Sequence, residues 1–126
     1  MQGLHLTADL SGCRCAGHWL TDAARLMTHC LTAVNASGLQ AVNHLAHTFP
    51  ASSHGPGGVT ATVLLAESHL CIHTWPETHG VTVDVYVCNF GADHSAKAHA
   101  LMDALVAHFV PAQVDRQALQ RGRAVA

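Results

Sequence analysis

A short segment near the middle of the chain concentrates side chains that can do chemistry. In LLAESHLCIHTWPE, residues 64–77, an apolar run gives way to hydroxyl, thiol, imidazole and carboxylate groups, which serve as nucleophiles, proton carriers and metal ligands. These residues are Glu67, Ser68, His69, Cys71, His73 and Glu77. The pair Glu67-Ser68 interrupts a sequence typical of buried strands, which packing alone does not explain.

One interpretation of this segment is a metal site. His69, Cys71 and His73 alternate, so on a strand they would share one face, and imidazole and thiolate are both zinc ligands. However, His-x-Cys-x-His is not a common zinc spacing, and adjacent residues of one strand rarely form a complete tetrahedral set. We therefore expect no metal.

A second interpretation is nucleophilic catalysis by Ser68 or Cys88 with a histidine base, which requires the three groups to converge. The glycines of a G-x-S-x-G elbow are missing around Ser68, so a hydrolase is disfavoured. The structural alternative is that His73 and Cys88 are core residues whose polar atoms are hydrogen-bonded and which have no chemical role, the commoner case for such residues on strands.

The elements that must position these residues follow from hydrophobic periodicity. Alternating or β-branched runs predict strands at 4–10, 39–49, 59–66, 70–75 and 81–88 and a weaker one at 112–119, while helical stripes predict helices at 21–35 and 95–109. Residues 50–58, rich in Pro, Gly and Ser, predict a long flexible loop. The order predicts an α+β two-layer sandwich, with two helices on one face of a mainly antiparallel sheet.

The strand at 81–88 shows which face of this sheet carries polar groups. Four valines at alternate positions predict a packed face, and Thr82, Asp84, Tyr86 and Cys88 alternate with them. The polar face is therefore expected to line a site.

Composition narrows the classes of protein. The 126 residues fit one domain, 49% of them are apolar, and six Lys and Arg residues with a formal charge of −2 argue against nucleic-acid binding. The longest apolar run is too short to span a membrane, and the N-terminal sequence does not resemble an export signal. We expect a cytoplasmic protein, in which five cysteines, an odd number, do not form a disulfide framework.

The motifs also carry a resemblance. GGVTATVLLAESHLCIHTWPE and VDVYVCNFGAD closely resemble the short bacterial form of S-adenosylmethionine decarboxylase, a pyruvoyl enzyme of polyamine synthesis, and a looser likeness extends from GLHLTADLSGC to QRG. The resemblance implies that the protein cuts its own chain between Glu67 and Ser68, giving chains 1–67 and 68–126. Ser68 would become a covalent pyruvoyl group, which forms a Schiff base with the substrate and needs no added coenzyme.

The resemblance also implies roles in the chemistry. His73 matches the proton acceptor of self-processing, and Thr60 matches a Ser or Thr that assists it. Cys88 matches the cysteine that donates a proton after decarboxylation, a role suited to a thiol that is protonated at neutral pH. On a regular strand Ser68 and His73 would face opposite ways, so we expect the cleavage site at a bend or bulge.

Three further residues match substrate-binding positions. Phe49 and Trp75 offer aromatic faces for an adenine ring and a sulfonium, and Glu77 offers a carboxylate for ribose hydroxyls. Ala61 stands where the family would have a glycine, and the loop at 50–58 looks longer than in compact relatives.

The sequence thus predicts a homodimer of cleaved protomers, with the site near the subunit interface, as the family implies. Its activity would be conversion of S-adenosylmethionine to decarboxylated S-adenosylmethionine (S-adenosylmethioninamine) and CO2, for spermidine synthesis. One alternative is a related decarboxylase of ornithine or arginine. Another is an inactive homologue that binds a partner, although such a protein would be expected to lose Ser68, His73 or Cys88.

Overall fold

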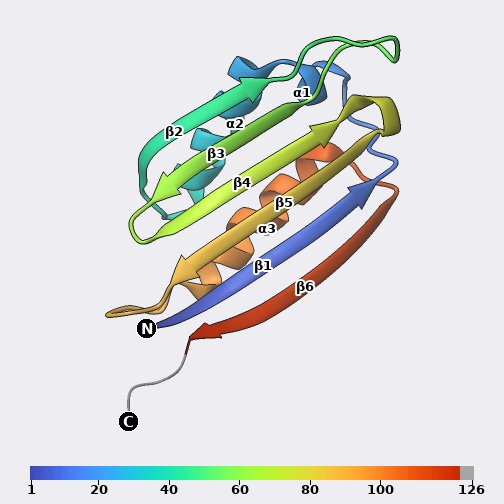
Figure 1. Ribbon diagram of the computed structural model, residues 1–126. Coiled ribbons are helices and arrows are strands. Elements are labelled where there is room, and N and C mark those ends of the chain that lie inside the picture. Colours follow the sequence, from blue (N-terminus) through green and yellow to red (C-terminus); the bar gives the residue numbers. More distant parts are fainter. Residues whose placement is uncertain (123–126) are drawn as a thin grey trace.

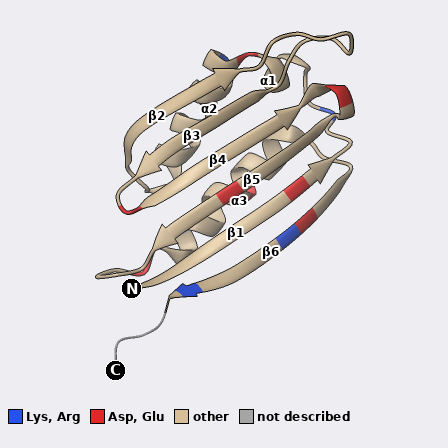
Figure 2. Cartoon of the chain, in the orientation of Figure 1, with Lys and Arg blue, Asp and Glu red and all other residues tan. Residues whose placement is uncertain are grey.

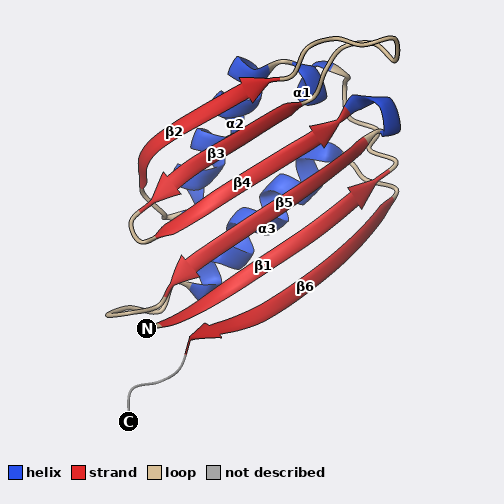
Figure 3. Cartoon of the chain, viewed as in Figure 1, coloured by secondary structure: helices blue, strands red, loops and turns tan. Residues whose placement is uncertain are grey.

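The computed structural model describes residues 1–122, which form one sheet with helices packed on one of its faces (Figures 1 and 3). The elements are β1 (Gln2–Ser11), α1 (His18–Thr21), α2 (Ala23–Ser37), β2 (Ala41–Thr48), β3 (Val59–Leu65), β4 (Ser68–Trp75), a 3-10 turn (Pro76–Thr78), β5 (Gly80–Cys88), α3 (Ser95–Phe109) and β6 (Gln113–Gly122).

The six strands lie in the order β2-β3-β4-β5-β1-β6, and every neighbouring pair is antiparallel (Figure 1). β4 lies inside the sheet and is hydrogen-bonded along its length to β3 on one side and β5 on the other. The predicted α+β sandwich is therefore confirmed.

The hydrophobic core lies between the sheet and the helices. The alternation predicted for β5 is observed, since its four valines are at most 1% exposed. The helical stripes of α2 and α3 meet this face with buried residues such as Leu26, Leu105 and Phe109. Complete burial of one such side chain contributes roughly 1.5–3 kcal/mol, so this layer fixes the orientation of β1, β3, β4 and β5, the strands with buried residues.

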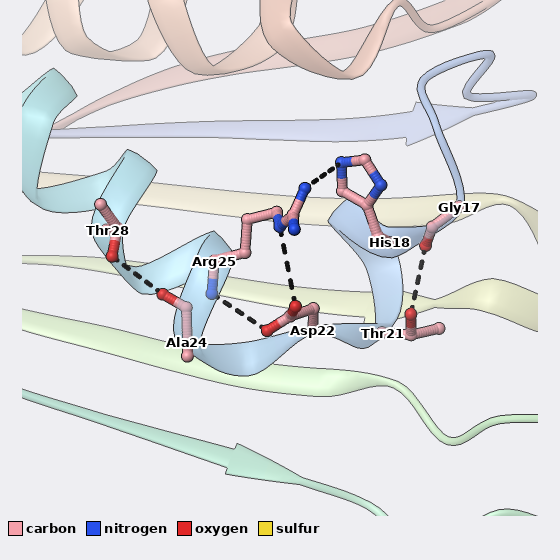
Figure 4. A network of polar contacts seen from close by, with 7 residues as sticks. All are labelled: Gly17, His18, Thr21, Asp22, Ala24, Arg25 and Thr28. Atoms are coloured by element: carbon pink, nitrogen blue, oxygen red, sulfur yellow. Dashed lines mark hydrogen bonds and ion pairs between the residues drawn. The ribbon is translucent and has the colours of Figure 1, made fainter.

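The start of α2 is held by a capping network (Figure 4). The Asp22 carboxylate accepts a hydrogen bond from the Arg25 backbone N–H at 3.1 Å, and the Arg25 side chain lies 3.7 Å from the other carboxylate oxygen. An N-cap aspartate satisfies a backbone donor that the helix leaves free. At the other end the helix is terminated by Gly38, whose φ of 89° is left-handed.

Two elements differ from the sequence prediction. The last strand is longer than expected, and all its residues are exposed, because it lies at the sheet edge and so lacks a strong apolar pattern. The short helix α1 was not predicted, since four residues are too few to show a periodicity.

In the part of the chain that the structure describes, no helix covers the face of the sheet opposite α2 and α3, and we call this face the open face. Few residues along the strands are charged (Figure 2). The open face carries polar side chains together with exposed apolar residues at Leu45, Leu64, Trp75 and Leu119. No helix within residues 1–122 is long and apolar enough to cross a membrane.

Candidate active site

The Glu67–Ser68 bond lies at the tip of a tight hairpin. Leu65 of β3 pairs with Ser68 of β4, so only Ala66 and Glu67 connect the two strands. Glu67 has φ 54°, a left-handed conformation that is uncommon for residues other than glycine and costs about 1–2 kcal/mol. The bend expected beside Ser68 is therefore present, and it takes the form of a turn.

The Ser68 hydroxyl lies beside the end of β5. Its Oγ accepts a hydrogen bond of 3.0 Å from the backbone N–H of Cys88, which is 8% exposed. The chain beyond Cys88 is fixed by Asn89, whose side chain accepts from the His94 N–H at 2.8 Å and donates to Ser95 Oγ at 3.0 Å. This end of the sheet thus brings Glu67, Ser68 and Cys88 together.

His73 lies on the open face with hydroxyl and thiol neighbours. It pairs directly with Thr60 of β3, and Thr60 Oγ1 lies 2.9 Å from His73 Nδ1. On its other side, Cys71 Sγ lies 3.4 Å from His73 Nε2 and 3.4 Å from Thr62 Oγ1. Both imidazole nitrogens therefore have a partner.

A pocket of about 390 Å³ opens next to His73. Its lining includes Phe49, Thr60, His73, Trp75 and Glu77, all of which the sequence predicted as site residues, and residues of the loop at 50–58 line most of the rest of it. The aromatic side chains of Phe49 and Trp75 are 49% and 42% exposed, so their surfaces are accessible to a ligand.

Two glycines allow this loop to pass close to the neighbouring backbone. A Cβ on Gly57 would lie 2.0 Å from the Phe49 carbonyl oxygen, and one on Gly58 would lie 2.0 Å from that of Thr74. The Phe49 N–H donates to the Gly58 carbonyl at 2.9 Å. Thr74, which the sequence did not single out, is buried and donates to the Leu20 carbonyl at 2.7 Å.

The predicted residues fall into two groups. A second pocket, of about 510 Å³, contains Glu67 and Ser68 together with His69, Tyr86 and Arg121. Ser68 and His73 are five residues apart on a regular strand, a span of about 16 Å. Within one chain, therefore, His73 and Thr60 do not reach the bond at Glu67.

The centre of the open face holds a polar cluster between the two groups. His5 Nε2 lies 3.3 Å from Asp84 Oδ1, and the ring of His69 stacks on Tyr86 with centroids 5.6 Å apart. Burial, and to a lesser extent nearby His5, lowers the pKa of His69, with Asp84 opposing the shift. His69 is therefore held neutral at physiological pH.

The arrangement does not form a metal centre within residues 1–122, where no group of three or more His, Cys, Asp or Glu side chains is placed to hold an ion. His69 stacks on Tyr86, while the nitrogens of His73 face Thr60 and Cys71. Of the three residues weighed as zinc ligands, Cys71 and His73 therefore contact each other, while His69 contacts Tyr86.

Comparison with known proteins identifies the class and then the family. Enzymes that release CO2 from an amino acid are carboxy-lyases, and the chain matches one family of them: the model described as S-adenosylmethionine decarboxylase covers residues 4–122. The chain belongs to the S-adenosylmethionine decarboxylase family.

Individual relatives agree over most of the chain. It is 37% identical over 121 residues to the S-adenosylmethionine decarboxylase proenzyme of Hydrogenobaculum sp. (strain Y04AAS1), covering 95% of this chain and 81% of that protein. It is 36% identical, with the same coverage, to the proenzyme of Aquifex aeolicus (strain VF5). The crystal structure of the adenosylmethionine decarboxylase from Aquifex aeolicus VF5 matches with a TM-score of 0.81 and 35% identity, over 98% of this chain and 92% of that one.

Proposed function

We propose that the chain is a self-processing, pyruvoyl-dependent decarboxylase of the cytoplasm. It converts S-adenosylmethionine to decarboxylated S-adenosylmethionine and CO2, providing an aminopropyl donor for spermidine. The observation that carries the proposal is the serine hydroxyl at a strained hairpin tip, held at 3.0 Å by the backbone N–H of the predicted proton donor, Cys88.

The hairpin tip suits self-cleavage. Ser68 Oγ attacks the carbonyl carbon of Glu67, and the peptide C–N bond is replaced by an ester. Loss of the Ser68 α-proton then expels the Glu67 carboxylate and leaves dehydroalanine, and water converts this to a pyruvoyl group with release of ammonia. The left-handed Glu67 raises the energy of the uncut chain locally, and cleavage relieves this strain.

Cys88 is suited to the decarboxylation step. The pyruvoyl group supplies the electron sink that makes loss of CO2 possible. The backbone N–H of Cys88 contacts Ser68 Oγ, and the low exposure of Cys88 limits competing protonation by water, so we assign protonation of the substrate carbon to the thiol of this residue. Cys88→Ala should be cut normally yet lose most turnover.

The pocket beside His73 favours a nucleoside substrate. Phe49 and Trp75 present exposed aromatic faces, which stack on bases and attract a sulfonium, and Glu77 supplies an acceptor for ribose hydroxyls. Ornithine and arginine could place a cation against an aromatic face, but they have neither a base to stack on it nor ribose hydroxyls to donate to Glu77. This lining is therefore the specific reason to prefer S-adenosylmethionine.

Two features support a homodimer. The site residues are split between the ends of β4, and the open face exposes apolar side chains, with Leu45 76% and Leu119 57% exposed. A second copy packed against this face by a two-fold axis would cover these residues, and would bring His73 and Thr60 of one chain to Ser68 of the other.

Intact mass spectrometry under denaturing conditions tests the proposal. The expected products are chains 1–67 and 68–126, the second lighter by one ammonia than a chain beginning with serine. Release of labelled CO2 should then be measured with S-adenosylmethionine, ornithine and arginine. Ser68→Ala should remain one inactive chain, and a cut, active Ser68→Ala protein would contradict the assignment.

A further inference from the structure

We propose that Cys71 is a positioning residue for His73, and that its sulfur completes a hydrogen-bonded set of Thr60, His73 and Cys71 that prepares the imidazole to accept a proton. The proposal rests on the function proposed above, in which His73 takes a proton during self-processing. It adds a residue to which the motif comparison gave no role.

The contacts define the set. Thr60 Oγ1 lies 2.9 Å from Nδ1 of His73, and Cys71 Sγ lies 3.4 Å from Nε2. Cys71 and His73 are alternate residues of β4 and share the open face, while Thr60 lies directly opposite His73 on β3. Two side chains, Thr60 of β3 and Cys71 of β4, thus contact the two nitrogens of the imidazole without any loop.

The direction of the hydrogen bonds follows from the role of His73. To take a proton through the Thr60 hydroxyl, Nδ1 must be unprotonated, so in the neutral ring Nε2 carries the hydrogen and donates it to Cys71 Sγ. The thiol hydrogen of Cys71 can then point to Thr62 Oγ1 at 3.4 Å. When His73 becomes an imidazolium, both nitrogens donate, and the polarisable sulfur accepts from the cation.

The contacts of His73 resemble those of the base in a nucleophile–base–orienter set, except that the hydroxyl beside it is that of Thr60, which passes on the proton, and not that of the attacking Ser68. A hydroxyl contacts one nitrogen of the base, and a third group holds the other nitrogen and selects the tautomer. Sulfur accepts more weakly than a carboxylate, so the effect expected of Cys71 is modest and measurable.

The surroundings of Cys71 distinguish it from the packing cysteines. Cys13 and Cys30 lie in the hydrophobic core. Burial, and to a lesser extent a neighbouring cysteine, raises the pKa of Cys13 to about 11 and that of Cys30 to about 12. Cys71 is only half-buried, lies on the open face and contacts two polar side chains. Its contacts are those of a polar group that orients a neighbour.

The first test follows self-cleavage of the full chain over time by intact mass. Cys71→Ala and the larger, apolar Cys71→Val should slow cleavage about tenfold, the order expected for one hydrogen bond to a reacting group. Cys71→Ser, which keeps an acceptor, should restore most of the rate. Cys15→Ala, in the loop before α1, is the control and should be cut at the normal rate.

A second readout reports the tautomer. In the uncut Ser68→Ala background, the ¹⁵N chemical shifts of His73 should show hydrogen on Nε2, and adding Cys71→Val should shift the population toward Nδ1. The signals are assigned by comparison with His73→Gln. A purely structural role of Cys71 would leave this balance unchanged.

The outcomes separate the two proposals. Normal cleavage of Cys71→Val with an uncut His73→Ala would overturn the role of Cys71 alone. Normal cleavage of His73→Ala would overturn the processing role of His73 and, with it, that of Cys71. If Cys71→Ala does not fold, Cys71→Val and the tautomer measurement decide, and an unchanged tautomer in Cys71→Val counts against the proposal.

Discussion

Two variants that fail to cleave alone should restore cleavage together if one processing centre is built from two chains. Ser68→Ala lacks the hydroxyl proposed to attack, and His73→Ala lacks the proposed proton acceptor. In a mixed dimer, the intact Ser68 of the second chain would face the intact His73 of the first. The His73→Ala chain should therefore be cut, although it carries no histidine at position 73.

The structure gives the magnitude behind this expectation. Ser68 and His73 are separated by about 16 Å along β4, whereas proton transfer through a hydrogen bond requires about 3 Å. β4 is paired on both sides, so closing the gap within one chain would break two ladders of hydrogen bonds. A chain acting alone should therefore be unable to use its own His73.

The assay is co-expression of the two variants with tags of different mass, followed by purification through both tags and intact mass spectrometry. In the doubly tagged dimers, nearly every His73→Ala chain should be cut. With random pairing in the unselected pool, about half of these chains should be cut. Ser68→Ala chains should stay whole in every sample.

A matched control pairs His73→Ala with a chain carrying both substitutions, and it should show no cleavage. Failure of the verified mixed dimer to cleave would refute the two-chain centre. So would full cleavage of the unaltered protein at dilutions where it is a monomer.

Three further predictions concern the rest of the molecule. The rings of His29 and His108 stack with their centroids 3.6 Å apart, and burial lowers the pKa of both. At His108 the nearby His29 and His18 lower the pKa further. The unfolded chain therefore binds protons first, so the free energy of unfolding should fall as the pH drops below about 6.5 and level off below the folded pKa values; His29→Gln should weaken this dependence in urea titrations. Val110 ends α3 with φ 48° and is 44% exposed, so Val110→Gly should add about 1 kcal/mol to the free energy of unfolding, whereas Val42→Gly in β2 should reduce it. Trp75→Ala should be cut normally and raise the KM for S-adenosylmethionine about tenfold, and an unchanged KM would remove Trp75 from the binding surface.

Much of the fold could be predicted because burial leaves a clear pattern. The valines of β5 and the stripes of α2 and α3 alternate or recur as their core contacts require. β6 was underestimated because neither of its faces is buried. Its pairing with β1 depends on contacts that its own sequence does not encode.

The candidate site was predictable in part for a geometric reason. Once a two-residue turn is assumed at Ala66-Glu67, antiparallel register places Thr60 opposite His73. The contact of Ser68 with Cys88 could not be inferred in this way, because β5 follows a separate connection. Alternation placed Cys71 on the correct face but could not show which neighbour it contacts.

The strand order has a consequence for a protein that cuts itself at Glu67. The upstream product would contain β1, β2 and β3, and the downstream product would contain β4, β5 and β6. In the sheet, strands of the two products are neighbours, since β1 lies between β5 and β6, while β3 borders β4. The two product chains are interleaved, so they cannot separate without breaking the backbone hydrogen bonds of three strand pairs, β3 with β4, β5 with β1 and β1 with β6. Maturation can thus break the chain in the middle of its sheet and still leave one stable molecule.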